Sequence, residues 1–131
     1  MKVIIAGGRD FADYDLVKEK LDNLFQNIKK ENLEIISGRC SRGILTFTTS
    51  EEIQVYGADG LGDRYAFENN IPVIPMPADW KIGKKAGVIR NEEMAKIANS
   101  CVVFWDGKSP GSKNMIENAK KYKLNLRIIR Y

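Results

Sequence analysis

The chain has 131 residues, enough for one domain with one hydrophobic core, and residues 1–131 are interpreted as a single domain. Apolar residues make up 44% and charged residues 29%, which is ordinary for a globular protein, and no apolar run approaches the roughly 18 residues of a transmembrane helix. The absence of histidine excludes a Ser-His-Asp triad, a histidine general base and most zinc sites. The net charge of +4 suits a small phosphorylated ligand and does not demand nucleic acid.

The N-terminal residues and the two cysteines say little about function. The apolar run in residues 1–10 (MKVIIAGGRD) is too short for a secretory signal, so we expect a cytoplasmic protein without a membrane partner. Cys40 and Cys101 do not form a CxxC pair, and Cys101 is expected to be a buried small hydrophobe. The sequence predicts no metal site and no cofactor.

Short apolar runs alternate with amphipathic segments along the chain, which is typical of an α/β fold. The apolar runs predict five strands, over residues 2–6, 33–36, 71–76, 101–105 and 126–130. The amphipathic segments predict four helices, over residues 14–29, 58–69, 87–98 and 113–122. The expected architecture is therefore a doubly wound, mainly parallel sheet with right-handed crossovers.

Side-chain types predict where these helices begin and which positions they bury. Asp13 is expected to cap the first helix, and Ser112 is a candidate cap for the last. Helical spacing predicts core positions at Leu16, Leu21, Leu24, Phe25 and Ile28, then Leu61, Tyr65 and Ala66, then Ile89, Met94 and Ile97.

Residues 42–56 interrupt the alternation. Two runs rich in β-branched and aromatic residues, 44–49 and 53–56, are separated by three polar residues, which predicts an inserted β-hairpin. Three roles for this hairpin remain open: a lid over a ligand site, an edge for dimerisation, or a decorative insertion.

The stretch over residues 78–94 (ADWKIGKKAGVIRNEEM) places basic residues and glycines at the start of a helix. A helix N-terminus favours an anion, glycine lets the backbone approach it, and Arg90 is suited to bidentate phosphate binding. An ordinary solvated basic loop is the structural alternative. Trp80 is expected either to cover the core or to offer a flat face to a base or sugar.

Several loops that follow strands are expected to meet at the carboxyl edge of the sheet, where doubly wound folds bind ligands. The candidate ligand-binding residues in these loops are Gly7, Gly8, Arg9, Ser37, Gly38, Trp80, Lys84, Gly87, Arg90, Asn91, Gly107, Ser109, Gly111 and Ser112. Asp106 and Asp59 are candidate catalytic carboxylates, with turn formation and helix capping as the alternatives. Neither GxGxxG nor GxxxxGK[ST] occurs, so an ordinary dinucleotide site and a P-loop are not indicated.

The motifs GGRDF, GADGLGDRYA, ADWKIGKKAGVIRNEEM and FWDGKSPGSKNMIENA resemble, in this order, the small YspA/YpsA-related proteins of the SLOG (Smf/DprA–LOG) superfamily. The resemblance covers nearly the whole chain. It implies a Rossmann-like sheet in the order 3-2-1-4-5 and a nucleotide or nucleotide-derived ligand. Members of this type are proposed to be nucleotide sensors or processors, often near phage or defence genes, and we expect a homodimer.

The leading interpretation is a protein that binds a phosphorylated nucleoside or nucleotide-derived ligand, as a sensor or a sequestering protein. The alternative is hydrolysis of an N-glycosidic bond, as in LOG phosphoribohydrolases, with Asp106 or Asp59 positioning water. Residues 110–114 (PGSKN) depart from the PGGxGTxxE motif of those enzymes, which weakens this alternative. Single-stranded nucleic-acid binding ranks third, because the basic residues are dispersed.

Overall fold

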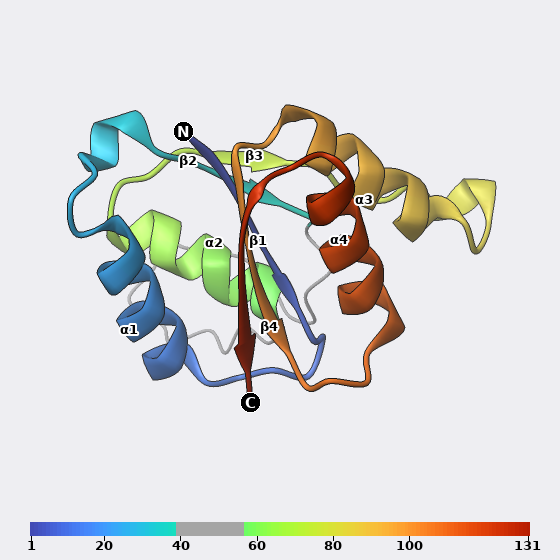
Figure 1. The fold of residues 1–131 in the computed structure, drawn as a ribbon, viewed down its shortest axis with the longest axis horizontal. Helices are drawn as coiled ribbons and strands as arrows, with labels where there is room; N and C mark the ends of the chain where they lie inside the picture. The colour runs from blue at the N-terminus through green and yellow to red at the C-terminus, as the bar shows by residue number, and fades with distance from the viewer. Residues whose placement is uncertain (39–56) are drawn as a thin grey trace.

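The computed structural model describes residues 1–38 and 57–131. Within these residues, one sheet of five parallel strands has the order β3-β2-β1-β4-β5 and carries helices on both faces (Figure 1). The strands are β1 (Lys2–Gly7), β2 (Glu34–Ser37), β3 (Val73–Pro75), β4 (Ser100–Trp105) and β5 (Asn125–Arg130). The helices are α1 (Tyr14–Phe25), α2 (Ala58–Glu68), α3 (Ala86–Ile97) and α4 (Pro110–Lys121), with 3-10 turns η1 (Lys30–Asn32) and η2 (Trp80–Ile82).

The predicted α/β architecture and strand order are confirmed. The β-hairpin expected over residues 42–56 lies outside the described residues. Of the helices in residues 1–38 and 57–131, none combines the length and the apolar character that crossing a membrane requires.

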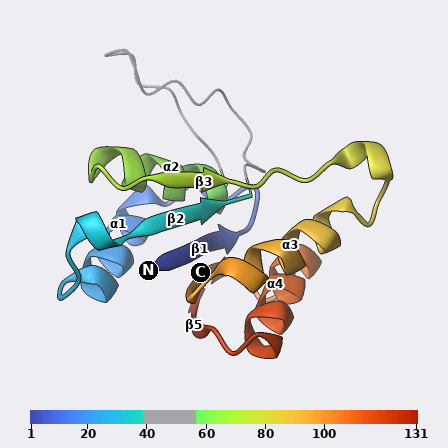
Figure 2. The same cartoon turned by 90° about the horizontal axis from the view of Figure 1, so that it is seen from above.

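Two hydrophobic layers enclose the sheet (Figure 2). Successive side chains of a strand point to opposite faces, so Val3 and Ile5 of β1 pack with α1 and α2, whereas Ile4 and Ala6 pack with α3 and α4. This burial on both faces explains why β1 is a continuous apolar run rather than an alternating one. Cys101 of β4 is fully buried, as predicted, and burial raises the pKa of its thiol to about 12.

The helix α1 begins as predicted and ends earlier. The carboxylate of Asp13 caps it by accepting a hydrogen bond from the backbone N–H of Leu16 at 3.1 Å. The helix stops at Phe25, four residues before the predicted end, and the N–H of Ile28 bonds back to the carbonyl of Phe25 in a turn. The fully buried positions are Val17, Leu21 and Phe25, while Leu16, Leu24 and Ile28 are partly buried beside the same core.

Two predictions for the helices of the second half are wrong. Ile89 and Ile97 are 43% and 41% exposed, because α3 faces α4 mainly through small and polar residues. Of the three core positions predicted for this helix, Met94 is buried. Ser112 is not the cap of α4: the cap position is Ser109, and Pro110 occupies the first helical position, where its missing N–H has no consequence. The predicted core positions of α2, Leu61, Tyr65 and Ala66, are buried.

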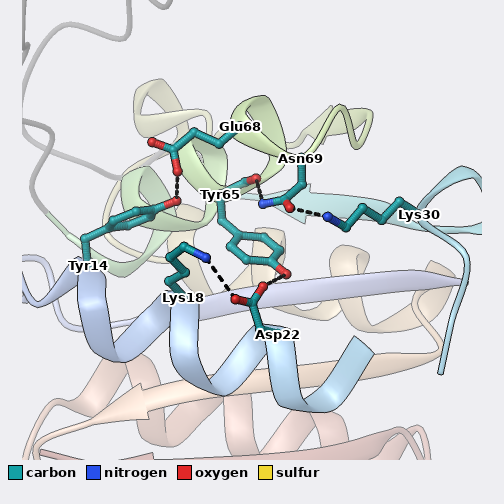
Figure 3. A network of polar contacts seen from close by, with 7 residues as sticks. All are labelled: Tyr14, Lys18, Asp22, Lys30, Tyr65, Glu68 and Asn69. Carbon is teal, nitrogen blue, oxygen red and sulfur yellow. Dashed lines mark hydrogen bonds and ion pairs between the residues drawn. The ribbon is translucent and has the colours of Figure 1, made fainter. Parts of the chain in front are cut away.

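A polar network joins α1 to α2 on the face opposite α3 and α4 (Figure 3). The hydroxyl of Tyr65, whose ring is buried in the core, donates to Asp22 at 2.8 Å, and Lys18 pairs with the same carboxylate at 3.0 Å. The hydroxyl of Tyr14 donates to Glu68 at the end of α2. These bonds fix the position of α2, whose first turn contributes to the candidate site described next.

Candidate functional site

A cavity of about 420 Å³ opens at the carboxyl edge of the sheet. Its volume lies within the range of roughly 300–1,000 Å³ that small-molecule sites occupy. The predicted ligand-binding or catalytic residues that line it are Gly7, Gly8, Arg9, Asp59, Arg90, Asn91, Asp106, Ser109, Gly111 and Ser112. Loops that are distant in the sequence therefore converge at one cavity, as the order of strands and loops predicts.

The other predicted site residues lie outside the lining, some of them directly behind it. Gly38 and Trp80 contact Arg90 and Arg9 respectively, so they touch residues that line the cavity. The remaining predicted residues outside the lining are Ser37, buried at the end of β2, the exposed Lys84, Gly87 beside Trp80, and Gly107 against Arg130.

Arg90 in the second turn of α3 is held in place by two hydrogen bonds. Its Nη1 donates to the carbonyl oxygen of Gly38 at 2.7 Å, and its Nε donates to Oδ1 of Asn91 at 3.0 Å. A side chain on Gly38 would collide with the guanidinium of Arg90 and would lie 3.1 Å from Oδ2 of Asp59. The guanidinium has five N–H donors, so these two bonds leave capacity for a ligand in the cavity that Arg90 lines.

Asn91 links Arg90 to α4. Its side chain is 7% exposed, and its Nδ2 donates to Oδ1 of Asn114 at 2.9 Å and to the carbonyl of Gly111 at 3.4 Å. Both ends of the Asn91 amide are therefore bonded within the protein. This geometry favours a positioning role over the base-edge contact expected from the sequence.

The first turn of α4 forms another wall of the cavity. The N–H of Lys113 makes a bond to the carbonyl of Ser109, so the N–H groups of Gly111 and Ser112 precede it and have no acceptor within the helix. Apart from its chain neighbours and the backbone of its own helix, no atom of the described residues lies within 4 Å of the position that a Cβ on Gly111 would take. A helix N-terminus with such open backbone suits an anion.

Asp106 organises the loop that leads into α4. Its Oδ1 accepts hydrogen bonds from the backbone N–H groups of Ser109 and Lys108, both at 2.8 Å. These bonds lower the pKa of the Asp106 carboxyl, that from Ser109 having the largest effect. The carboxylate is therefore a loop-forming anion, the structural alternative expected from the sequence, even though it also lines the cavity.

Gly7 brings the first turn of α2 to the cavity. Its φ of +153° is favourable for glycine, and a Cβ there would collide with the carbonyl of Phe104 and lie 2.8 Å from Cβ of Ala58. The adjacent carbonyl of Gly8 accepts a bond from the N–H of Ala58 at 3.1 Å. The end of β1 and the start of α2 are thus joined through backbone atoms.

Comparisons with known proteins find similarity over parts of the chain. Residues 1–47 match the model of the YAcAr family, described as "YspA, cpYpsA-related SLOG family". The similarity to the SLOG-related family rests on these first 47 residues. The chain is 40% identical over 72 residues to the Gene 61 protein of Mycobacterium phage D29, a match that covers 50% of this chain and 58% of the phage protein. No solved structure matches it significantly.

Sequence reasoning missed several residues that line the site. Tyr131 follows β5, and its ring stacks on Phe11 with centroids 4.4 Å apart. Desolvation, and then the carboxylates of Asp106 and Asp10, raise the pKa of its phenol. The register that pairs β4 with β5 places the residue after β5 at the carboxyl edge, which was the available signal. The other missed residues are Ala6, Asp10, Gly57, Ala58, Met94, Pro110 and Met115.

The cavity thus combines three kinds of chemistry. Arg9, Arg90 and the first turn of α4 offer positive charge and N–H donors. The carboxylates of Asp10, Asp59 and Asp106 offer acceptors for hydroxyl groups, and the buried Met94 and Met115 supply an apolar surface. The described residues contain no group of three or more His, Cys, Asp or Glu side chains arranged to hold a metal ion.

Proposed function

We propose that the chain binds a phosphorylated nucleoside or a nucleotide-derived ligand in this cavity, as a sensor or a sequestering protein. The observation that carries the proposal is that Arg90 and the first turn of α4 line the same cavity and are joined by Asn91. An arginine fork and a helix N-terminus each bind phosphate oxygens, and fixing the two together reduces the ordering cost of binding.

The rest of the cavity suits a sugar better than a bare phosphate. Asp59 stands in the first turn of α2, and its Oδ2 lies on the side of Gly38 that also faces the guanidinium of Arg90. A carboxylate accepts hydrogen bonds from a pair of ribose hydroxyls and repels additional phosphates. The relationship to the SLOG superfamily supports the same class of ligand.

Three further expectations accompany this proposal. The similarity to a mycobacteriophage protein supports a phage or defence setting. A homodimer in the cytoplasm is the expected state, and light scattering of the purified protein tests the dimer. Nucleic acid is not the expected ligand, and a steep salt dependence of binding to single strands would argue for it.

N-glycosidic hydrolysis by Asp106 receives less support. A general acid or base works best with a pKa near the working pH, whereas backbone hydrogen bonds lower the pKa of Asp106. The same oxygen is committed to the N–H groups of Lys108 and Ser109. Binding without turnover is therefore the preferred function.

A thermal-shift screen with ribose 5-phosphate, nucleoside mono-, di- and triphosphates and ADP-ribose tests the proposal. A ligand at 100 times its dissociation constant stabilises the fold by about 2.7 kcal/mol, which raises the melting temperature by several degrees. Chromatography of each stabilising ligand separates the two functions, since intact ligand indicates binding and free base indicates hydrolysis.

Two variants of Arg90 and a control variant of Arg127 localise the effect. Arg90→Ala should abolish the shift, and Arg90→Lys should retain only part of it because lysine cannot bind in a bidentate way. Arg127→Ala removes the same charge from the exposed surface of β5, outside the cavity lining, and should leave the shift intact. Equal losses in Arg127→Ala and Arg90→Ala would indicate a non-specific charge effect and contradict the proposal.

A further inference from the structure

Trp80 is an exposed aromatic side chain at the border of the cavity. It opens η2, the turn that projects past the carboxyl edge of the sheet between β3 and α3 (Figure 2). Its side chain is 52% exposed, although tryptophan is mostly buried in proteins. Cζ of Arg9 lies 5.7 Å from the centroid of its ring, and Arg9, unlike Trp80, lines the cavity. Trp80 therefore stands behind an arginine that faces the candidate ligand.

Hydrogen bonds order the turn η2, which carries Trp80. Oδ1 of Asp79 accepts a bond from the N–H of Lys81 at 3.2 Å, and the N–H of Gly83 bonds to the carbonyl of Trp80 at 3.2 Å. At the start of α3, a Cβ on Gly87 would lie 3.3 Å from Cη2 of the indole, so glycine gives the ring room to pack there. The ring thus has a defined place before any ligand arrives.

We propose that the guanidinium of Arg9, supported by Trp80, is the stacking surface for the planar base of the ligand. A guanidinium is flat and stacks on bases as well as on aromatic rings. The cation–π attraction between Arg9 and the indole orders the guanidinium. This inference rests on the proposed function, because it assigns one end of the same nucleotide. It names a heteroaromatic base, rather than a sugar phosphate alone, as part of what the site recognises.

The charges around Arg9 favour a base over a second phosphate there. The next residue, Asp10, lines the cavity as Asp106 does, and after desolvation both carboxylates contribute to raising the pKa of the Tyr131 phenol. Two carboxylates at this part of the wall repel a phosphate. A neutral base can stack on Arg9 without that repulsion, and phosphate is better placed at Arg90 and α4.

The test compares AMP with ribose 5-phosphate, which has the same sugar and phosphate and lacks the base. Dissociation constants are measured by calorimetry for the parent, Trp80→Ala and Trp80→Phe. The parent should bind AMP more tightly than ribose 5-phosphate. Trp80→Ala should weaken AMP binding up to roughly ten-fold, because Arg9 loses the cation–π contact that holds its guanidinium in the stacking position. Trp80→Phe should weaken it less, because a phenyl ring keeps part of that contact. Binding of ribose 5-phosphate should change less than about two-fold, because that ligand makes no stacking contact.

The matched control is Ile82→Ala, which truncates another exposed apolar residue of η2 and should leave both affinities unchanged. Melting temperatures of all variants verify that they are folded. If Trp80→Ala weakens both ligands equally, or if the parent does not prefer AMP, the stacking surface is wrong while phosphate binding stands. If the parent binds neither ligand, the proposed function fails as well.

Discussion

Arg90 and Asn91, consecutive residues of α3, are hydrogen-bonded to each other through their side chains, with Nε donating to Oδ1 at 3.0 Å. Arginine has no acceptor, so this bond dictates which end of the Asn91 amide faces Arg90. The Nδ2 end then points to α4, where Oδ1 of Asn114 accepts from it at 2.9 Å and from Asn118 at 3.3 Å. The orientation of the cation in the cavity therefore depends on side chains of a different helix.

Replacing Asn114 with leucine should weaken ligand binding although Asn114 does not line the cavity. The substitution leaves the Nδ2 of the buried Asn91 without its nearest acceptor, which costs about 1–3 kcal/mol of stability and allows the amide to turn away from Arg90. We expect roughly a five-fold loss of affinity for AMP in calorimetry, by analogy with the coupling energies of residues in one network.

Asn69→Leu is the matched control for that prediction. The Nδ2 of Asn69 donates to the carbonyl of Tyr65 at 2.9 Å at the end of α2, away from the cavity lining. This variant should lose a similar amount of stability and keep its affinity for AMP. An Asn114→Leu protein that is less stable but binds AMP normally would show that Asn91 does not depend on α4 for its orientation.

Gly38→Ala should mimic the loss of Arg90. The added methyl group would collide with the guanidinium and must displace it, which breaks the bond from Nη1 to the carbonyl of Gly38. Because the displaced group is the end of a flexible side chain, the fold should keep most of its stability while affinity for AMP falls about ten-fold, the equivalent of roughly 1.4 kcal/mol. Calorimetry of the double variant provides the check: once Arg90 is alanine, Gly38→Ala should have no further effect on binding.

Gly111→Ala should separate stability from binding. Apart from its chain neighbours and its own helix backbone, no atom of the described residues lies within 4 Å of the new methyl group. Alanine is favoured over glycine in a helix, so unfolding should require about 0.5–1 kcal/mol more. The same methyl group stands in the first turn of α4 at the cavity wall, where it should obstruct a phosphate and lower the affinity for AMP about ten-fold or more.

Denaturant unfolding and calorimetry of the Gly111→Ala variant measure both effects. Gly62→Ala serves as the comparison, because its methyl group would lie 2.8 Å from Cβ of Ile5 in the core and should destabilise the fold by about 1–3 kcal/mol. A stabilised Gly111→Ala protein with unchanged AMP affinity would place the phosphate elsewhere.

The fold was predictable because burial leaves a strong pattern in the sequence. The apolar runs around Ile4 and Val102 are continuous because both faces of the sheet are covered, and this pattern predicts a parallel sheet. Helical spacing failed in α3 for a physical reason. That helix buries the small or polar residues Ala86, Asn91 and Ala95 against its neighbours. A prediction from hydrophobicity selects Ile89 and Ile97 instead, and both are exposed.

The candidate site was predictable as a set of loops and less so as a set of contacts. Strand ends locate Arg9, Arg90 and Gly111 at one edge, since parallel strands end together. The sequence does not reveal that Asn91 is used internally, because its partner Asn114 lies 23 residues away on another helix. Tyr131 was missed because its role follows from the register of β5 against β4, a pairing between segments rather than a motif.

Tyr65→Phe should destabilise the protein in a manner that depends on pH. The buried phenol donates to Asp22 at 2.8 Å, and loss of a hydrogen bond to a charged group costs about 1.5–3 kcal/mol. Burial, and then Asp22, raise the pKa of Tyr65 above its usual value near 10. The folded state therefore holds this proton more tightly, so the contribution is complete below pH about 10 and is lost as the pH rises further.

The behaviour at low pH follows from Asp22, the hydrogen-bond partner of Tyr65. Hydrogen bonds from Lys18 and then Tyr65 lower the pKa of Asp22, so the stability that this carboxylate contributes is present above its ordinary pKa near 4 and is lost as the pH falls below it. Urea unfolding from pH 3 to 11 should show the parent more stable than Tyr65→Phe between about pH 5 and 9, with the difference shrinking at both ends. Tyr122→Phe, which removes a bond from a half-buried phenol to Glu92 on the other side of the sheet, should cost less. A difference that does not vary with pH would mean that Tyr65 stabilises the fold through packing alone.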